Sequence, residues 1–152
     1  ASMLQMKSAL GGIPVRQAMV TEFKVLQPLD TLQQAVDHIL AGTQQDFPVV
    51  EGDRLVGILT RADLLTAISR HSEASRVNAA MRRDFETVHP GDMLEAASRR
   101  LQACGCPVFP VVQDERLVGL LTMENIGELL MIRSALELRS LRKSATQGAG
   151  SQ

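Results

Sequence analysis

Thr60 and Asp63 combine a hydroxyl and a carboxylate at a spacing that could bind a ligand. They stand where a short apolar run, 55–60, gives way to a helical pattern, so the free N–H groups of a helix N-terminus are expected beside them. Such a terminus favours a phosphate through its unsatisfied donors and its dipole, and Arg61 could reach one. The same pair is also an ordinary cap, with Thr60 as N-cap and Asp63 favourable in the first turn. The spacing alone leaves ligand binding and capping both open.

The cysteines and histidines are weaker candidates for chemistry. Cys104 and Cys106 are separated by one residue, which is not the spacing of a redox pair or a zinc knuckle, and no second pair completes a metal site. We therefore expect two structural thiols in a loop and no metal site. His38, His71 and His89 are far apart in the sequence, and no nucleophile or metalloprotease motif accompanies them. The chain is not expected to be an enzyme, and no catalytic residue is assigned.

The segment that contains Thr60 occurs twice in the chain. Residues 47–60, FPVVEGDRLVGILT, return as 109–122, FPVVQDERLVGLLT, at an offset of 62 positions. The same offset, without a gap, aligns seven upstream residues with seven identical ones: Val15, Ala18, Met19, Phe23, Pro28, Asp30 and Leu32 with Val77, Ala80, Met81, Phe85, Pro90, Asp92 and Leu94. A shared register over this length indicates a duplicated unit.

Each copy predicts a strand followed by an amphipathic helix. The runs 23–27 and 85–89 favour a first strand, which a proline then ends. The next helix has a predicted N-cap and capping-box partner in each copy: Asp30 with Gln33, and Asp92 with Glu95. Apolar residues at helical spacing define its buried face: Leu32, Ala35, Val36, Ile39 and Leu40 in the first copy, and Leu94, Ala97 and Leu101, beside Ser98, in the second.

A hairpin and a second helix complete each copy. Apolar runs at 47–50 and 55–60, joined by a polar turn with a glycine, predict the first hairpin, and the second copy keeps the pattern without the glycine. Each copy therefore has the order β-α-β-β-α. One unit of roughly 60 residues buries only a marginal core, so two units packed sheet to sheet would cover each other's strands. We expect an α/β fold of two packed repeats.

This duplicated order resembles a tandem pair of CBS domains, also called a Bateman module. The resemblance rests on Val-x-x-x-Met at the start of each copy and on Leu-Val-Gly-h-h-Thr (h, hydrophobic) before its last helix, and it covers residues 15–130. It implies a pseudo-two-fold CBS pair with clefts between the repeats. An adenine nucleotide, AMP or ATP, would bind there as a regulatory ligand, and no cofactor would be required.

The resemblance also implies which residues bind the nucleotide. The family motif Gly-h-x-Thr-x-x-Asp is complete at 57–63, where Asp63 would accept the ribose hydroxyls, whereas the second copy has Asn125 in that place. The first motif is therefore expected to be the stronger site. An apolar slot for adenine would come from Phe47, Pro48 and the stretch 19–25. The full expected set is Met19, Thr21, Phe47, Pro48, Thr60, Arg61, Asp63, Phe109, Pro110, Thr122 and Asn125.

The repeat predicts the domain organisation. We expect an N-terminal extension at 1–14, CBS repeat 1 at 15–70, a linker at 71–76, CBS repeat 2 at 77–132 and a C-terminal extension at 133–152. The last helix could continue to about Lys143, with more apolar residues than one repeat needs to bury, which suggests a homodimer. The tail after Ser144 is expected to be disordered.

The net charge and the distribution of apolar residues limit the kinds of partner that the chain is expected to bind. A net charge of −1 with interspersed charges gives no reason to expect a nucleic-acid surface, and no apolar run could insert into a membrane. We expect the cytoplasm, or the cytoplasmic face of a membrane protein. Residues 121–129 also resemble the last helix of CBS pairs attached to site-2-type membrane metallopeptidases, which would make this chain the regulator of a fused effector domain. Two alternatives stay open: a ligand-free dimerisation scaffold, and a sensor of another ligand such as S-adenosylmethionine.

Overall fold

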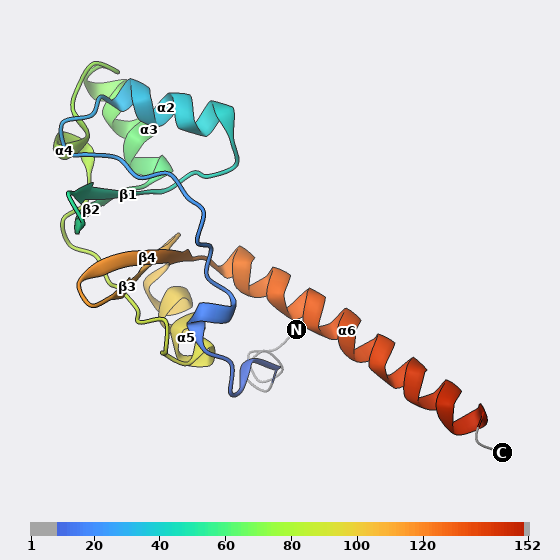
Figure 1. Cartoon of the computed structure of the whole chain (residues 1–152). Coiled ribbons are helices and arrows are strands. Elements are labelled where there is room, and N and C mark those ends of the chain that lie inside the picture. The colour runs from blue at the N-terminus through green and yellow to red at the C-terminus, as the bar shows by residue number, and fades with distance from the viewer. Residues whose placement is uncertain (1–8, 151–152) are drawn as a thin grey trace.

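The computed structural model describes the backbone of residues 9–150 and the side chains of residues 9–146. Helices and hairpins follow each other in two copies (Figure 1). The first copy contains α2 (Leu32–Ala41), β1 (Phe47–Glu51), β2 (Arg54–Leu59) and α3 (Arg61–Arg70). The second contains α5 (Leu94–Cys104), β3 (Phe109–Gln113), β4 (Arg116–Leu121) and α6 (Met123–Gly150). Short helical turns, η1 (Val15–Gln17) and α4 (Val77–Ala80), precede them. The predicted α/β fold of two repeats is confirmed.

The two hairpins have the same register and different turns. In both, the first strand residue pairs with the last, as in Phe47 with Leu59 and Phe109 with Leu121. The first turn uses Gly52 at a φ of 65°. In the second turn, Asp114 and Glu115 adopt φ values of 53° and 65°, a region that non-glycine residues rarely occupy. The missing glycine is thus replaced by two strained residues, and the hairpin is kept.

The predicted first strands at 23–27 and 85–89 are wrong as strands. Within each segment the described structure forms one isolated parallel bridge, from Leu26 to Val49 and from Val88 to Val111. Each bridging residue makes two backbone hydrogen bonds of 2.8–3.0 Å to the hairpin. A proline two residues later cannot donate to a ladder, so the pairing stops there.

The predicted helix caps are also displaced by one residue. The N-cap of α2 is Thr31, in a capping box with Gln34, and that of α5 is Met93, which makes no side-chain cap. Asp30 and Asp92 instead accept the N–H groups of Gln27 at 2.8 Å and His89 at 2.9 Å. These carboxylates close the turn before each helix, which moves the helix start one residue along. Another correction concerns Leu40, expected on the buried face of α2, which is 80% exposed.

The segments that open the sequence repeats are exchanged between the packed units. Val15 donates its N–H to Asp92 O at 2.8 Å, so the start of repeat 1 packs on repeat 2. The reciprocal contact joins Val77 N to Asp30 O at 2.7 Å, so the start of repeat 2 packs on repeat 1. In Figure 1 the blue segment that contains η1 lies with α5 before the chain runs to the other unit. The exchange ties the two repeats together.

The hairpins lie between outer helices, and three small clusters form the cores. Ile58, Val108 and Leu120 pack together between the hairpins. One outer core lies under α5 and α6 and the other under α2 and α3. The first contains Leu10, Ile13, Val15, Val88, Leu94, Ala97, Leu101, Phe109, Val111, Leu121 and Ile126. The second contains Leu26, Leu32, Ala35, Phe47, Val49, Leu59, Leu64, Val77 and Met81.

The glycine of each Leu-Val-Gly motif allows an exchanged segment to approach β2 or β4. A Cβ on Gly57 would lie 2.9 Å from the carbonyl oxygen of Arg82, and a Cβ on Gly119 would lie 3.1 Å from that of Val20. We predict that Gly57→Ala lowers the free energy of unfolding by about 1–3 kcal/mol, because a backbone atom cannot move aside cheaply. Urea unfolding measures this loss.

Gly127→Ala is the matched control for Gly57→Ala. Gly127 lies inside α6, and no atom of another element or side chain lies within 4 Å of the place that a methyl group would take there. Alanine should therefore leave stability unchanged or raise it by up to about 1 kcal/mol. A Gly57→Ala protein as stable as the parent would contradict the close approach of the exchanged segment.

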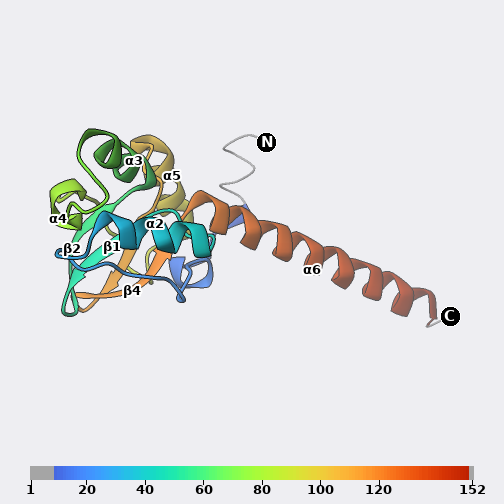
Figure 2. The same ribbon diagram turned by 90° about the horizontal axis from the view of Figure 1, so that it is seen from above.

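α6 extends far beyond the repeats. In Figures 1 and 2 its C-terminal part projects away from the hairpins and from the other labelled helices. The helix continues to Gly150, beyond the predicted end near Lys143, while the disorder of the tail after Ser144 stays a prediction; residues 151–152 lie outside the described residues. Leucine, glutamate, arginine and alanine favour the helix up to about Lys143, and no proline interrupts the weaker helix formers that follow it. Among the helices of residues 9–150, none has the length and apolar character needed to cross a membrane.

Candidate functional site

A cleft of about 560 Å³ lies between the two repeats, beside the start of α6. Side chains from four segments line it: 20–23, 43–46, 106–108 and 120–125. Both repeats contribute, so the cleft exists only in the packed pair. Its volume is within the range of small-molecule pockets, and we call it the Thr122 cleft.

Hydrogen bonds hold the walls of the Thr122 cleft in place. Val20 and Leu120 exchange two backbone bonds of 2.8 and 2.9 Å across the repeats. Gln44 clamps the opposite wall, because its side-chain amide accepts from Lys24 N at 2.8 Å and donates to Lys24 O at 2.9 Å. The same amide donates to Asp46 O at 3.0 Å. Backbone pairing therefore holds one wall of the cleft, and the Gln44 side chain holds the other.

Thr122 and Asn125 lie in this cleft and cap α6. The Thr122 hydroxyl donates to Asn125 Oδ1 at 2.8 Å and accepts from Asn125 N at 3.1 Å, while Thr122 N donates to the same Oδ1 at 3.2 Å. This is the capping arrangement that the spacing left open. A ligand would meet these two polar groups at the N-terminus of a long helix.

Thr60 and Asp63 cap α3 in the same way, but Asp63 has a further partner. Thr60 Oγ accepts from Asp63 N at 3.1 Å, and Arg82 Nε donates to Asp63 Oδ2 at 2.6 Å. The Arg82 guanidinium holds the pKa of the Asp63 carboxyl below its ordinary value. The pair therefore adds stability above the ordinary carboxyl pKa and loses it as pH falls through the lowered value. Because Arg82 is 59% exposed, that contribution is small.

Asp46 gives the Thr122 cleft an unusual carboxylate. Burial raises its pKa, and the nearby charge of Glu124 raises it further. The N–H of Arg61 opposes this by donating to Asp46 Oδ1 at 3.1 Å. A partly buried carboxylate beside another carboxylate marks a region in which further negative charge is unfavourable.

The structure brings together only part of the expected site. Thr122 and Asn125 line the cleft, whereas Phe47, Pro48, Phe109 and Pro110 are buried in the cores or beside them and are not among its lining residues. Met19 is half-buried against Gly119, and Thr21 is exposed. Thr60, Arg61 and Asp63 lie on the equivalent face of the other copy, not in the Thr122 cleft.

Sequence reasoning missed the loop 43–46 and Glu124 as lining residues. The loop lies between α2 and β1 and carries no motif, so only its packing against the other repeat reveals it. Glu124 lies inside the second motif, between Thr122 and Asn125, and its proximity to the cleft could have been inferred from that position.

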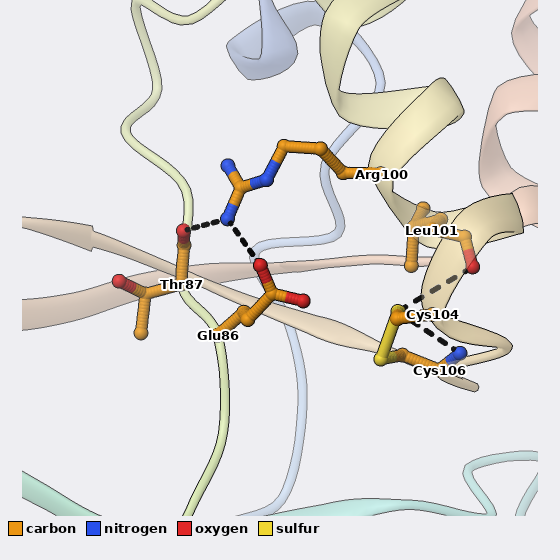
Figure 3. The surroundings of a disulfide bond; sticks show 6 residues. All are labelled: Glu86, Thr87, Arg100, Leu101, Cys104 and Cys106. Carbon is orange, nitrogen blue, oxygen red and sulfur yellow. Dashed lines mark hydrogen bonds and ion pairs between the residues drawn. A yellow bond between two sulfur atoms is a disulfide. The ribbon is translucent and has the colours of Figure 1, made fainter.

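Cys104 and Cys106 form a disulfide at the end of α5 (Figure 3). The prediction of two structural thiols is therefore wrong for this structure; their Cα atoms are 5.2 Å apart, a separation that allows the bond. Glu86 lies near both sulfurs, but it pairs with Arg100 at 3.1 Å, and bonded sulfurs offer no thiolate to a metal.

Comparison with protein families matches the CBS domain model at residues 15–70 and 74–131. A curated relative, L-aspartate semialdehyde sulfurtransferase of Methanosarcina acetivorans, is 31% identical over 124 residues. That match covers 80% of this chain and 25% of the relative, so the chain spans about a quarter of that protein's length.

Two solved structures have the same fold. A putative acetoin utilization protein (AcuB) from Vibrio cholerae superposes with a TM-score of 0.72 at 25% identity, covering 87% of this chain and 96% of that protein. CBSX2, solved in complex with AMP, superposes with a TM-score of 0.69 at 26% identity, covering 84% of this chain and 99% of CBSX2.

Proposed function

This chain belongs to the CBS domain family as a tandem pair, and we propose that it is a regulatory module that binds an adenosine-containing ligand between its repeats. The observation that carries the proposal is the Thr122 cleft, a preformed space of about 560 Å³ between the two repeats. Its polar end is a helix N-terminus with a hydroxyl and an amide, and its apolar walls include Val20, Phe23 and Leu120. AMP bound to CBSX2 supports an adenosine ligand.

The Thr60 face is the second candidate place for the ligand. We define it as Thr60, Arg61, Asp63 and Arg82, which lie at the start of α3 and after α4. It keeps the complete family motif, but a ribose that binds Asp63 would compete with the Arg82 guanidinium for the carboxylate oxygens. We propose that a ligand bound at either place changes the relative angle of the repeats, with a coupling equal to its differential affinity for the two arrangements.

A thermal-shift panel with AMP, ADP, ATP, adenosine and S-adenosylmethionine tests the proposal. Binding to the native state alone stabilises it by about 2.7 kcal/mol at a hundredfold excess over Kd, so we predict a rise in Tm of about 5–10 °C with at least one of them. Asp63→Ala and Asn125→Ala, each compared without ligand as its own control, show which motif is used. No rise with any compound at millimolar concentration would contradict adenosine binding.

A dimerisation scaffold is the second candidate function, because apolar side chains are exposed along α6. Figure 2 shows the C-terminal part of this helix projecting away from the repeats. Met131, Leu138 and Leu141 are 75%, 59% and 61% exposed and lie seven and three residues apart, as a and d positions of a coiled-coil heptad do, with Ser134 at the d position between Met131 and Leu138. In a parallel pair of α6 helices, Glu137 of each copy would lie beside Arg142 of the other. This charge complementarity favours a second copy of the chain as the partner.

Light scattering measures this association. We predict a dimer for the parent protein and a monomer for Leu138→Glu/Leu141→Glu, since two charges would then face each other in the seam. Ser140→Glu, outside the seam on the same helix, should remain a dimer. A parent protein that is monomeric at every concentration would contradict this assembly.

For the protein that this module regulates, we propose a general class and no individual identity. Since the chain spans a quarter of one curated relative, we propose that it controls a fused or associated effector domain in the cytoplasm or at the cytoplasmic face of a membrane. The relatives reported above do not support a site-2-type metallopeptidase, so that domain is left unassigned. Within the module itself we assign no catalytic residue.

A further inference from the structure

The Thr122 cleft is acidic. Three carboxylates line it, from Glu22, Asp46 and Glu124, and its lining among the described side chains includes neither lysine nor arginine. They come from both repeats and from three separate segments of the chain. The charge of Arg61, outside the lining, weakly favours the ionised form of Asp46.

The negative charge of the Thr122 cleft can be compared with the equivalent positions of the other copy through the internal repeat. At the offset of 62 residues, three uncharged positions of the Thr122 half correspond to arginines of the Thr60 half: Val20, Thr21 and Met123 with Arg82, Arg83 and Arg61. Two of the carboxylates correspond to apolar residues, Asp46 to Val108 and Glu124 to Ala62, while the third, Glu22, corresponds to Asp84. The duplicated halves therefore differ in charge at the same structural positions.

The negative charge of the Thr122 cleft affects which ligands can bind in it. A nucleotide phosphate carries about two negative charges near neutral pH, comparable to a phosphorylated side chain, and would enter a space that already holds three carboxylates. Asp46 is partly buried, where like charges repel more strongly than in water, while Glu22 and Glu124 are exposed. An uncharged nucleoside avoids the repulsion, and a sulfonium or ammonium group gains attraction.

We propose that the Thr122 cleft takes an adenosyl ligand that carries no phosphate, either neutral or positively charged. This inference rests on the proposed function, since it names the ligand class of the same cleft. Adenine and ribose would occupy the apolar walls and the Thr122 end, and the 5′ substituent would lie among the carboxylates. A phosphate-bearing nucleotide would find its cations on the Thr60 face.

Adenosine and AMP differ only in the phosphate and are the probes for this proposal. The full ¹⁵N-labelled chain is titrated with each, and the amide signals of Val20, Thr122 and Asn125 report binding in this cleft. We expect Kd from these signals to be at least about tenfold lower for adenosine than for AMP. In Glu22→Gln/Glu124→Gln the ratio should fall severalfold, because the repulsion is removed while size and hydrogen bonding are kept.

Glu73→Gln/Glu115→Gln is the control, since it removes the same charge from exposed positions outside the cleft and should leave the ratio unchanged. Equal affinities in the parent protein, or a ratio that the cleft variant does not change, would overturn the charge selectivity while adenosine binding stands. If neither compound shifts these amides and the thermal panel is also negative, the proposed function fails together with it.

Discussion

Phe47→Ala and Phe109→Ala are each expected to lower the free energy of unfolding by about 3–5 kcal/mol. Each phenylalanine is a fully buried aromatic of one outer core, at 0% and 1% exposure, and the chain has neither tryptophan nor tyrosine. Removing the ring leaves a cavity that neighbouring aliphatic residues fill only in part. A loss of this size is a large fraction of the stability of an ordinary domain. Urea unfolding measures it.

Phe23→Ala is the control for these two variants. Phe23 is half-buried at the edge of the central cluster, so its removal should cost clearly less than that of Phe47. If Phe47→Ala and Phe109→Ala each cost below about 1 kcal/mol, the two outer cores would not be packed as described.

Val108→Asp is expected to cost about 3–5 kcal/mol at neutral pH, because it places a carboxylate without a partner between the hairpins. Val108 is 5% exposed and packs with Ile58 and Leu120, which hold the two repeats together. Burial raises the pKa of such a carboxyl, so the cost should be full above the raised pKa and shrink as the group is protonated at acid pH. Urea unfolding at several pH values measures both effects.

Asp46→Asn is the matched variant at the equivalent position of the first copy. The pKa of Asp46 is raised, so its ionised form disfavours folding above that pKa, and below the ordinary carboxyl pKa the penalty is absent. Asparagine keeps an acceptor for Arg61 N and should therefore be neutral or stabilising near pH 7, with a smaller gain at acid pH. A Val108→Asp protein as stable as its parent at pH 7 would contradict the close packing of the hairpins.

The sequence predicted the hairpins and the helices that follow them. It did not predict that the opening segment of each repeat packs on the other repeat. Repeated apolar runs and turn residues are local signals, and they predicted both hairpins even where Asp114 and Glu115 replace the glycine. The pairing of Val15 with Asp92 joins distant parts of the chain, and no local pattern reports it. The cap of α2 was misplaced because Asp30 and Thr31 are both capping residues, and the choice depends on which N–H the Asp30 carboxylate accepts.

The sequence predicted the residues of the candidate site that lie at a helix N-terminus. It did not predict the loop that forms a wall of the cleft. The duplicated motif identified Thr122 and Asn125, which do line the cleft. The loop 43–46 joins them only when the repeats pack, and Phe47, expected beside the ligand, is buried because its side chain faces the core. The sequence also indicated the first motif as the stronger site, whereas the structure places Arg82 on Asp63 and opens a cleft at the second. Which motif binds stays a prediction.

A crystal structure of the full chain grown with adenosine tests the central claim most directly. Ligand bound between the repeats, with its base against Val20 and Phe23 and its ribose at Thr122, is the predicted result. An empty Thr122 cleft at an adenosine concentration that fully shifts the Tm would contradict it, since the ligand would then have to bind elsewhere.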